Sequence, residues 1–191
     1  MNEDPIGSIA MIVGVVLAIF VMIAIARAVR IVPQSEAYVV ERLGRFRSVL
    51  HGGIHLLVPF VDRVAARIDL REQVVNFPSQ SVITADQAMV EIDSVIYFQI
   101  TDPRSATYEV ANFLQAIEQL TATTLRNLIG SLDLEETQTS RESINKQLRG
   151  VLDEATGPWG IRVTRVELKS IEPPPNVLSA MVQQITAERT K

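Results

Sequence analysis

The first part of this chain contains a long stretch without a charged residue, and this stretch constrains everything that follows it. Residues 6–26 are 21 consecutive uncharged and mostly apolar residues. As an α-helix they would extend about 31 Å, close to the hydrocarbon thickness of a bilayer. We therefore predict a single transmembrane helix that tethers the rest of the chain. Its anchoring side chains would include Ile6, Ile12, Val16, Phe20, Ile23 and Ala26.

Three other interpretations of residues 6–26 are open. A cleaved signal peptide normally starts with positive charge and has a shorter apolar core, whereas Glu3 and Asp4 precede this long segment. A buried helix that is apolar on all sides would need a larger core than a chain of this size offers. An interfacial helix needs a polar face, which this segment lacks. The sequence therefore favours the transmembrane interpretation.

The charges on the two sides of the stretch predict its orientation. No Lys or Arg precedes it, whereas Arg27, Arg30, Arg42, Arg45 and Arg47 follow it closely. The positive-inside rule then places the N-terminus outside and the rest of the chain in the cytoplasm, at the plasma (inner) membrane. Arginines at this boundary also attract anionic lipids. We expect the residues that face the headgroups to be Arg27, Arg30, Arg45 and Arg47.

The composition excludes several classes of function. The chain has 18 basic and 22 acidic residues, and only the acidic Glu3 and Asp4 precede the apolar stretch. The remainder is nearly balanced in charge, which argues against a nucleic-acid partner. The chain has no Cys, so disulfides, thiolate metal sites and a Cys nucleophile are excluded. The only two His residues, His51 and His55, flank a Gly-Gly pair without an evident third ligand, and we expect no metal or other cofactor.

The periodicity after residue 27 predicts a mixed α+β fold. Alternating apolar residues predict strands at 37–43, 67–77, 81–84, 89–100 and 161–171. In the last of these the apolar phase shifts between Val163 and Val166, which indicates a bulge or a bend. Helical spacing predicts one helix around residues 114–128 and a second that opens at Thr139, where Glu142 would complete a capping box.

Breaks in these patterns suggest the domain boundaries. Pro78 interrupts a predicted strand, and residues 173–175 are three consecutive prolines. We expect a tail and anchor at 1–27, a membrane-proximal subdomain at 28–77, a second subdomain at 78–175, and the start of a C-terminal helix at 176–191.

An apolar run at residues 54–61 is interrupted by Pro59, which disfavours a central strand. Two interpretations stay open. The run is either a short buried strand or a loop that dips into the bilayer interface, to which the anchor holds it close. In the second case the inserted side chains would be Ile54, Leu56, Leu57, Val58, Phe60 and Val61.

The chain ends inside its last predicted helix, without a capping or stop signal. We expect this helix to continue in a longer protein, and a frayed true C-terminus is the alternative. Val177, Met181 and Ile185 share one helical face. We expect this face to pack between neighbouring copies, with Glu188 and Arg189 forming pairs across them. The alternative is that the apolar face docks on its own domain.

No pattern typical of catalysis is present. The chain lacks a glycine-rich loop followed by Lys-Ser or Lys-Thr, and it lacks a Gly-x-Ser-x-Gly elbow. The acidic residues at 133–136 belong to a polar connector, which is typical of a solvated surface. Pairs such as Ser143 and Lys146 are common by chance. We therefore predict that the chain is not an enzyme.

Short segments spread along the chain resemble, in order, the stomatin-like branch of the stomatin/prohibitin/flotillin (SPFH, band 7) superfamily, of the bacterial type. They are ERLGRF at 41–46, GIHLLVPFVDRV at 53–64, DLREQ at 69–73, VITAD at 82–86, YFQITDP at 97–103, LRNLIG at 125–130, WGIRV at 159–163, VELKSI at 166–171 and AER at 187–189. The chain departs from the family at Gly52-Gly53, where Pro-Gly is usual, and at Asp86-Gln87, where Asp-Asn is usual.

The resemblance implies a two-part SPFH domain followed by a long coiled-coil helix. It also implies a non-enzymatic scaffold without cofactors that assembles into large homo-oligomeric rings or cages, organises a membrane microdomain and modulates enclosed membrane proteins. The implied partners are copies of the chain itself, membrane lipids, and an NfeD-type membrane protein or a membrane protease. Two alternatives remain: an accessory regulatory subunit of a membrane protease or channel, and a membrane-tethered hydrolase.

Overall fold

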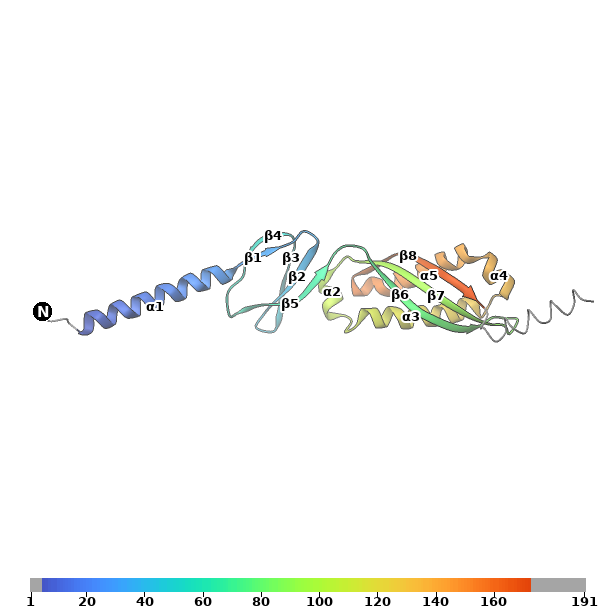
Figure 1. The fold of residues 1–191 in the computed structure, drawn as a ribbon, viewed down its shortest axis with the longest axis horizontal. Coiled ribbons are helices and arrows are strands. Elements are labelled where there is room, and N and C mark those ends of the chain that lie inside the picture. The colour runs from blue at the N-terminus through green and yellow to red at the C-terminus, as the bar shows by residue number, and fades with distance from the viewer. Residues whose placement is uncertain (1–4, 173–191) are drawn as a thin grey trace, which may run out of the picture. The chain divides into compact units, whose positions relative to one another are not determined.

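The computed structural model describes residues 5–172, in which two compact units are distinguished (Figure 1). Unit 1 is Met1–Leu70 and unit 2 is Arg71–Lys191, so the division falls before the boundary that Pro78 suggests. The mixed α and β content that the sequence predicts is confirmed. The helix predicted from residue 176 lies outside the described residues.

Unit 1 consists of a long helix followed by two small antiparallel sheets. The helix α1 (Pro5–Ala28) leads directly into β1 (Val29–Val32), which pairs with β4 (Gly53–Leu56). In the second sheet, β2 (Glu36–Arg42) lies between β3 (Arg45–Leu50) and β5 (Asp62–Asp69). The centre of the unit is β2, because Ala37, Val39 and Val40 have no exposed surface.

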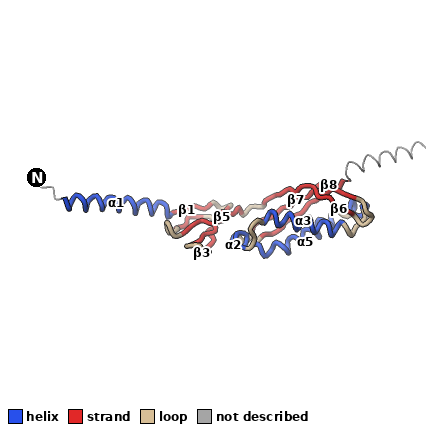
Figure 2. Tube along the Cα trace, turned by 90° about the horizontal axis from the view of Figure 1, so that it is seen from below, coloured by secondary structure: helices blue, strands red, loops and turns tan. Residues whose placement is uncertain are grey.

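Unit 2 is a three-stranded antiparallel sheet with helices on one face. The strand order is β6 (Gln73–Ile83), β7 (Met89–Ile100) and β8 (Ile161–Glu172). Between β7 and β8 the chain forms α2 (Pro103–Tyr108), α3 (Phe113–Ile129), α4 (Leu134–Thr139), α5 (Arg141–Thr156) and a short 3-10 helix (Gly157–Trp159). Figure 2 shows α3 and α5 running along the same face of the sheet.

The core of unit 2 lies between β7 and these two helices. The inward residues of β7 predicted from alternation are buried, which confirms that face: Val90, Ile92, Ile96, Phe98 and Ile100. Each apolar side chain of this size contributes about 1.5–3 kcal/mol when fully buried. The opposing helices contribute fully or almost fully buried residues at helical spacing, namely Ile117, Leu125 and Ile129 from α3 and Ile144, Leu148 and Leu152 from α5.

The strand predicted at 67–77 is divided in the structure. β5 ends at Asp69, and β6 begins at Gln73 and continues past Pro78. The pairing register of β6 with β7 shifts between Phe77 and Gln80, so the proline falls at an irregularity of an edge strand, where its missing amide hydrogen is tolerated. The predicted bend in the last strand is confirmed, because Tyr97 pairs with Arg165 and Phe98 with Val163, leaving Thr164 between them.

The capping box is formed at a different place from the predicted one. Asp133 and Glu136 exchange side-chain and backbone hydrogen bonds at the start of α4. Thr139 is the last residue of that helix, and α5 begins at Arg141 without a side-chain cap. At both positions a possible capping residue is followed three residues later by a glutamate, which is the spacing of a capping box. The acidic residues at 133–136 also place negative charge at the N-terminus of a helix, where it is favourable.

Gly160 joins the beginning of β8 to the end of β7. Its carbonyl accepts hydrogen bonds from the amides of Thr101 at 2.8 Å and Asp102 at 3.1 Å. Its φ is +69°, and a Cβ added there would lie 2.5 Å from the carbonyl oxygen of Asp102. Only glycine satisfies both the left-handed backbone and the close approach.

We predict that Gly160→Ala destabilises unit 2 by about 2 kcal/mol or more, because it adds a left-handed alanine and a steric clash. The melting temperature of the full chain in detergent should fall by roughly 10 °C. The matched control is Gly150→Ala in α5, where an added Cβ meets nothing within 4 Å. This control should be stabilised by about 0.5–1 kcal/mol. Equal melting temperatures for the two variants would contradict the structural role of Gly160.

Candidate site at the end of the N-terminal helix

α1 is apolar and has little contact with the rest of the described protein. Its segment Met11–Ala28 is long and apolar enough to cross a membrane, and none of it is buried inside the protein. This exposure contradicts the interpretation as a buried helix of a soluble core. The predicted anchoring residues with described side chains are all exposed, namely Ile12, Val16, Phe20, Ile23 and Ala26. Ile6 belongs to α1, but its side chain lies outside the described part.

The loop that follows β4 folds back onto α1. The amide of Leu57 donates a hydrogen bond to the carbonyl of Ala28 at 2.8 Å. Further along the loop, the ring of Phe60 stacks on the ring of Phe20, with centroids 6.2 Å apart and planes within 5°. Phe20 precedes Ala28 by about two helical turns, or roughly 12 Å along the helix axis. The loop therefore runs back along the side of α1, from the C-terminal end of the helix to a point about two turns before that end.

The apolar side chains of residues 54–61 are largely exposed. The most exposed are Ile54 at 74%, Leu56 at 76% and Phe60 at 80%, and Val58 is also exposed. Leu57 and Val61 are half-buried. The interpretation of this run as a short buried strand is therefore wrong. β4 ends at Leu56, and Pro59 lies in the turn that follows.

Two apolar residues in neighbouring turns of unit 1, Leu43 and Phe60, have left-handed backbone conformations. Phe60 has φ +68°, and Leu43, which is 80% exposed, has φ +50°. Leu43 and Gly44 form the two-residue turn between β2 and β3, where Asn-Gly or Asp-Gly is the usual choice. The amide of Leu43 donates to the carbonyl of Val61 at 3.3 Å, which brings the two turns together.

We call Leu43, Val58 and Phe60 the apolar tip of unit 1. A leucine or phenylalanine with a left-handed backbone lowers the folding stability by about 1 kcal/mol or more. In the isolated protein these side chains are exposed, so burial does not offset this cost. The sequence analysis did not identify Leu43. One feature of the sequence could have indicated this residue: Leu43 is a large apolar residue directly before Gly44, at a position where hairpin turns favour Asn or Asp.

A buried carboxylate holds the apolar tip in place. Asp62 accepts hydrogen bonds from Arg42 Nε at 2.6 Å and Arg42 Nη2 at 3.0 Å, and from Arg47 Nη1 at 3.0 and 3.2 Å. It also accepts the backbone amide of Val58 at 2.8 Å. The Asp62 side chain has no exposed surface, whereas the two guanidinium groups remain partly exposed. One carboxylate thus joins the β2–β3 hairpin, the loop and the start of β5.

The surroundings of Asp62 favour its charged form. Burial of the carboxyl opposes ionisation, but the hydrogen bond from Arg42, the amide of Val58 and the positive charge of Arg42 outweigh it and hold the pKa below its usual value. Because the pKa is lower in the folded than in the unfolded state, this cluster contributes stability above the ordinary aspartate pKa of about 4. The contribution is lost as the pH falls through the lowered pKa.

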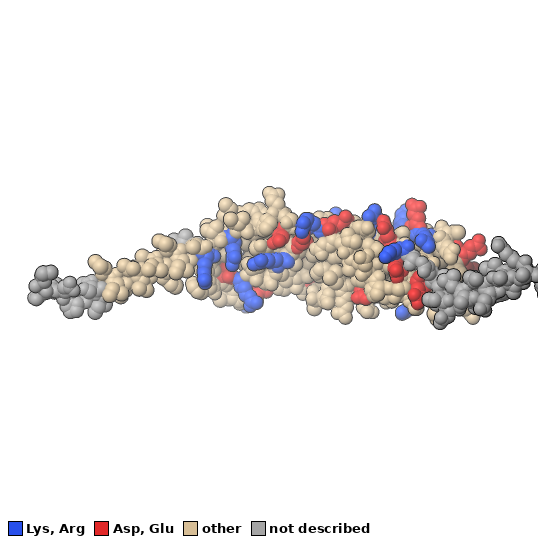
Figure 3. All heavy atoms as spheres, viewed as in Figure 1, with Lys and Arg blue, Asp and Glu red and all other residues tan. Residues whose placement is uncertain are grey.

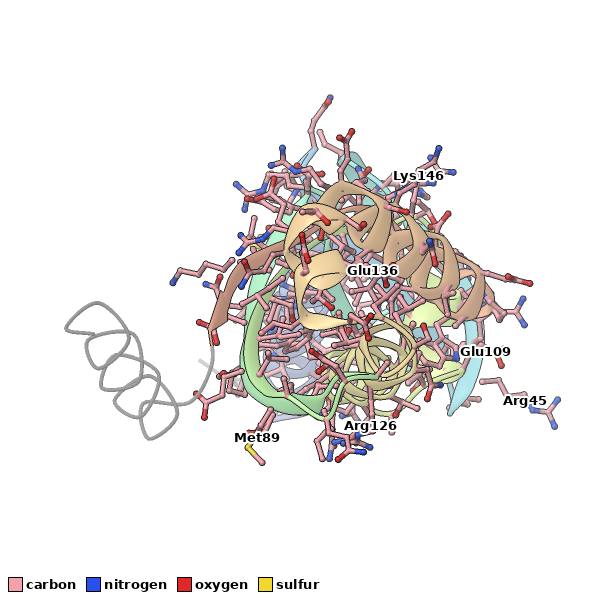
Figure 4. All side chains as sticks on the ribbon, turned by 90° about the vertical axis from the view of Figure 1, so that its right-hand side faces the viewer. Arg45, Met89, Glu109, Arg126, Glu136 and Lys146 are labelled. Atoms are coloured by element: carbon pink, nitrogen blue, oxygen red, sulfur yellow. The ribbon has the colours of Figure 1, made fainter. Side chains whose placement is uncertain are left out.

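The predicted headgroup-facing arginines differ in their surroundings. Arg27, at the end of α1, and Arg30, in β1, are exposed. Arg45 is exposed as well, and Figure 4 shows it projecting away from the ribbon. Arg47 instead binds Asp62. Arg63 and Arg67 are also exposed in β5, although they were not among the arginines expected at the headgroups. No strand was predicted at Arg63, and Arg67 was expected only on the outward face of a strand at 67–77.

The two histidines interact with each other locally. His55 Nε2 lies 2.6 Å from the carbonyl oxygen of His51. Within the described residues, no group of three or more His, Asp or Glu side chains is arranged to hold a metal ion. The predicted contact residues Val177, Met181, Ile185, Glu188 and Arg189 lie outside the described residues.

Comparison with known proteins places these observations in a family context. The family described as "SPFH domain / Band 7 family" matches residues 30–191. A protein of Mycobacterium tuberculosis H37Rv named only as uncharacterized is 57% identical over 176 residues, which are 92% of this chain and 46% of the relative. A stomatin homolog of Pyrococcus horikoshii is 39% identical over 92% of this chain and 66% of its own length.

A mitochondrial stomatin-like protein 2 from Bos taurus is similar as well. It is 42% identical over 160 residues, which are 84% of this chain and 45% of the relative. The chain spans about half the length of several relatives that it matches.

We predict that Asp62→Asn loosens the apolar tip at neutral pH, because a neutral amide cannot hold two guanidinium groups and the Val58 amide equally well. Hydrogen exchange of the amides at residues 58–62 should become faster. In the unmutated protein the same change should appear only when the pH is lowered below about 4. The control is Glu154→Gln, which neutralises an exposed carboxylate on α5. Exchange that is unchanged in Asp62→Asn would contradict the role of this cluster.

Proposed function

The chain belongs to the SPFH domain / band 7 family, and we propose that it is a stomatin-like membrane scaffold that assembles into a large homo-oligomeric ring or cage. In this proposal the chain catalyses no reaction, and it organises a patch of membrane and modulates the membrane proteins that the ring encloses. Stomatin-like SPFH proteins are typically membrane-associated scaffolds, which supports the proposal. The observation that carries it is the exposed apolar helix α1 with the ring of Phe60 stacked against it.

The contact between Phe60 and α1 supports insertion of the apolar tip into the bilayer. If α1 spans the hydrocarbon and Arg27 marks its boundary, Phe20 lies about 10 Å inside that boundary. Because Phe60 stacks on Phe20, its ring lies at a similar depth. Transfer of the exposed side chains of Leu43, Val58 and Phe60 from water into the hydrocarbon of the bilayer is also favourable.

The Asp62 cluster is suited to a position close to the hydrocarbon. Charged groups near lipid are tolerated when they are paired, and the carboxylate of Asp62 has partners on each oxygen. Arg27 and Arg30 remain exposed beside it, where they meet the headgroups. The positive-inside rule then places the domain in the cytoplasm, with the N-terminus outside the plasma (inner) membrane.

Assembly into a ring is supported by the physics of tethering. Membrane attachment confines copies of the chain to two dimensions and one orientation, so weak contacts between neighbours add up through multivalency. We propose that the segment from residue 176 supplies such contacts through Val177, Met181 and Ile185. An NfeD-type membrane protein or a membrane protease is the proposed enclosed partner. A stoichiometric partner that co-purifies with small species would favour the accessory-subunit alternative.

We predict that the protein extracted in a mild detergent forms large closed particles in single-particle images. The double variant Met181→Glu/Ile185→Glu places charges on the proposed contact face and should shift the material to small species. The control is Val151→Glu, which changes an exposed valine on α5 and should leave the particle size unchanged. A wild-type monomer, or large particles that persist in the double variant, would contradict the proposed assembly.

We predict that a fluorescent label at Phe60→Cys is quenched by lipids that carry a quencher on their acyl chains. The chain has no natural cysteine, so the label is confined to this position. The control is Gln34→Cys, at an exposed position near the start of β2, roughly 20 Å from the tip along that strand. This label should be quenched only weakly. Equal quenching at the two positions would contradict insertion of the tip.

A further inference from the structure

Unit 1 contains a hollow of about 400 Å³ beside the C-terminal end of α1. Four arginines line it: Arg27 from α1, Arg30 from β1, and Arg63 and Arg67 from β5. The loop at residues 57–60, which includes Pro59 and part of the apolar tip, also lines it. In Figure 3 the described surface of α1 shows no charged side chain before its C-terminal end, next to which basic side chains gather on unit 1.

The positive charge of this hollow is not balanced from within the described protein. Asp62 is the only acidic residue that lines it, and Arg42 and Arg47 already bind its carboxylate. Arg27, Arg30 and Arg63 have no ion-pair partner among the described residues. Arg67 lies over the ring of Tyr38, with its guanidinium carbon 5.2 Å from the centroid, an arrangement that leaves its edge donors available. The hollow is therefore suited to an anion.

The hollow is also amphipathic. Its lining includes guanidinium groups, which bind phosphate oxygens in a planar, forked geometry. The lining also includes Phe60, whose ring stacks on Phe20 of α1. Arg27 lies about 10 Å from Phe20 along the helix axis. A ligand that fits both parts carries a phosphate at the level of Arg27 and hydrocarbon at the level of the two phenylalanine rings.

We propose that this hollow binds one anionic phospholipid, with the phosphate between Arg27, Arg30 and Arg63 and the acyl chains along Phe60 and α1. The proposal rests on the membrane insertion proposed above, and it goes beyond a diffuse attraction of arginines to headgroups. It replaces Arg45, which projects away from the protein, and Arg47, which Asp62 engages, with Arg63 from β5. A free phosphate would use the arginines but leave the apolar wall unused, so the lipid is the favoured occupant.

The test uses the full chain in nanodiscs of phosphatidylcholine with a minor fraction of phosphatidylglycerol. Trace amounts of either lipid, spin-labelled on an acyl chain, report the share that is immobilised on the protein. The unmutated chain should immobilise phosphatidylglycerol in preference to phosphatidylcholine. In the variant Arg30→Gln/Arg63→Gln, this preference should fall by about fivefold for each arginine removed.

A charge-matched control separates a defined site from general electrostatics. Arg149→Gln/Arg162→Gln removes two exposed arginines from α5 and β8 of unit 2, and it should keep the preference for phosphatidylglycerol. An equal loss in this control, or no loss in Arg30→Gln/Arg63→Gln, overturns the proposal. Displacement of the immobilised lipid by millimolar glycerol phosphate overturns the choice of a lipid and indicates a soluble phosphate ligand.

The failure of this site is distinguishable from the failure of membrane insertion. The label at Phe60→Cys is measured in the same Arg30→Gln/Arg63→Gln background. Quenching that persists while the preference is lost supports a lipid site on an inserted loop. A preference that survives in Arg30→Gln/Arg63→Gln while quenching also persists overturns the site and leaves the insertion intact.

Discussion

The arrangement of unit 1 depends on one carboxylate bound by two guanidinium groups. Asp62 is linked through Arg42 to β2, through Arg47 to β3, and through the Val58 amide to the loop. Without these bonds the loop at residues 57–61 would have only a few backbone hydrogen bonds to oppose collapse of its apolar side chains onto the sheet. With them, Val58 and Phe60 stay exposed, and the ring of Phe60 stacks on Phe20 of α1. The same carboxylate binds Arg42 and Arg47, whereas Arg27, Arg30 and Arg63 have no ion-pair partner among the described residues.

The two units differ in how their stability arises. Unit 2 has a continuous core between its sheet and α3 and α5, and buried residues of the size of Leu148 or Ile96 contribute a few kcal/mol each. Unit 1 has a small core centred on β2, and much of its apolar surface is exposed on α1 and on the apolar tip. Small cores are marginal on their own. A bilayer that binds the folded form of unit 1, but not an unfolded one, would add to its stability by linkage.

The sequence predicted the features that depend on local pattern. The uncharged stretch gave α1, the alternation at 89–100 gave β7 and its buried face, and the helical spacing before Gly130 gave α3. The sequence analysis expected the capping box at Thr139 and assigned residues 133–136 to a polar connector, although Asp133 and Glu136 have the same spacing and form the box. It also merged the end of β5 with the start of β6, because the alternation continues through the connection. Pro78 was taken to end a strand, whereas an irregular edge strand accommodates it.

The candidate site was predicted only in part. The apolar run and its Pro59 left open a short buried strand or a loop at the membrane, and Arg27 and Arg30 were expected to face the headgroups. The ion pairs of Asp62 were not predictable, because its partners lie 15 and 20 residues away along the chain and meet only through the sheet. Leu43 was missed for the same reason. Its role appears when the hairpin turn is seen beside the loop, which the hydrogen bond from Leu43 to Val61 establishes.

The stacking of Phe60 on Phe20 has a consequence for motion. A domain that is joined to a membrane by a single helix and a flexible linker can rotate freely about the axis of that helix. Here the ring of Phe60 contacts the side of α1 about two turns before its end, so α1 and the sheets of unit 1 rotate together. An inserted tip resists tilting as well as rotation. Each copy would then present the same sides to its neighbours, which reduces the orientational entropy that must be lost before copies join.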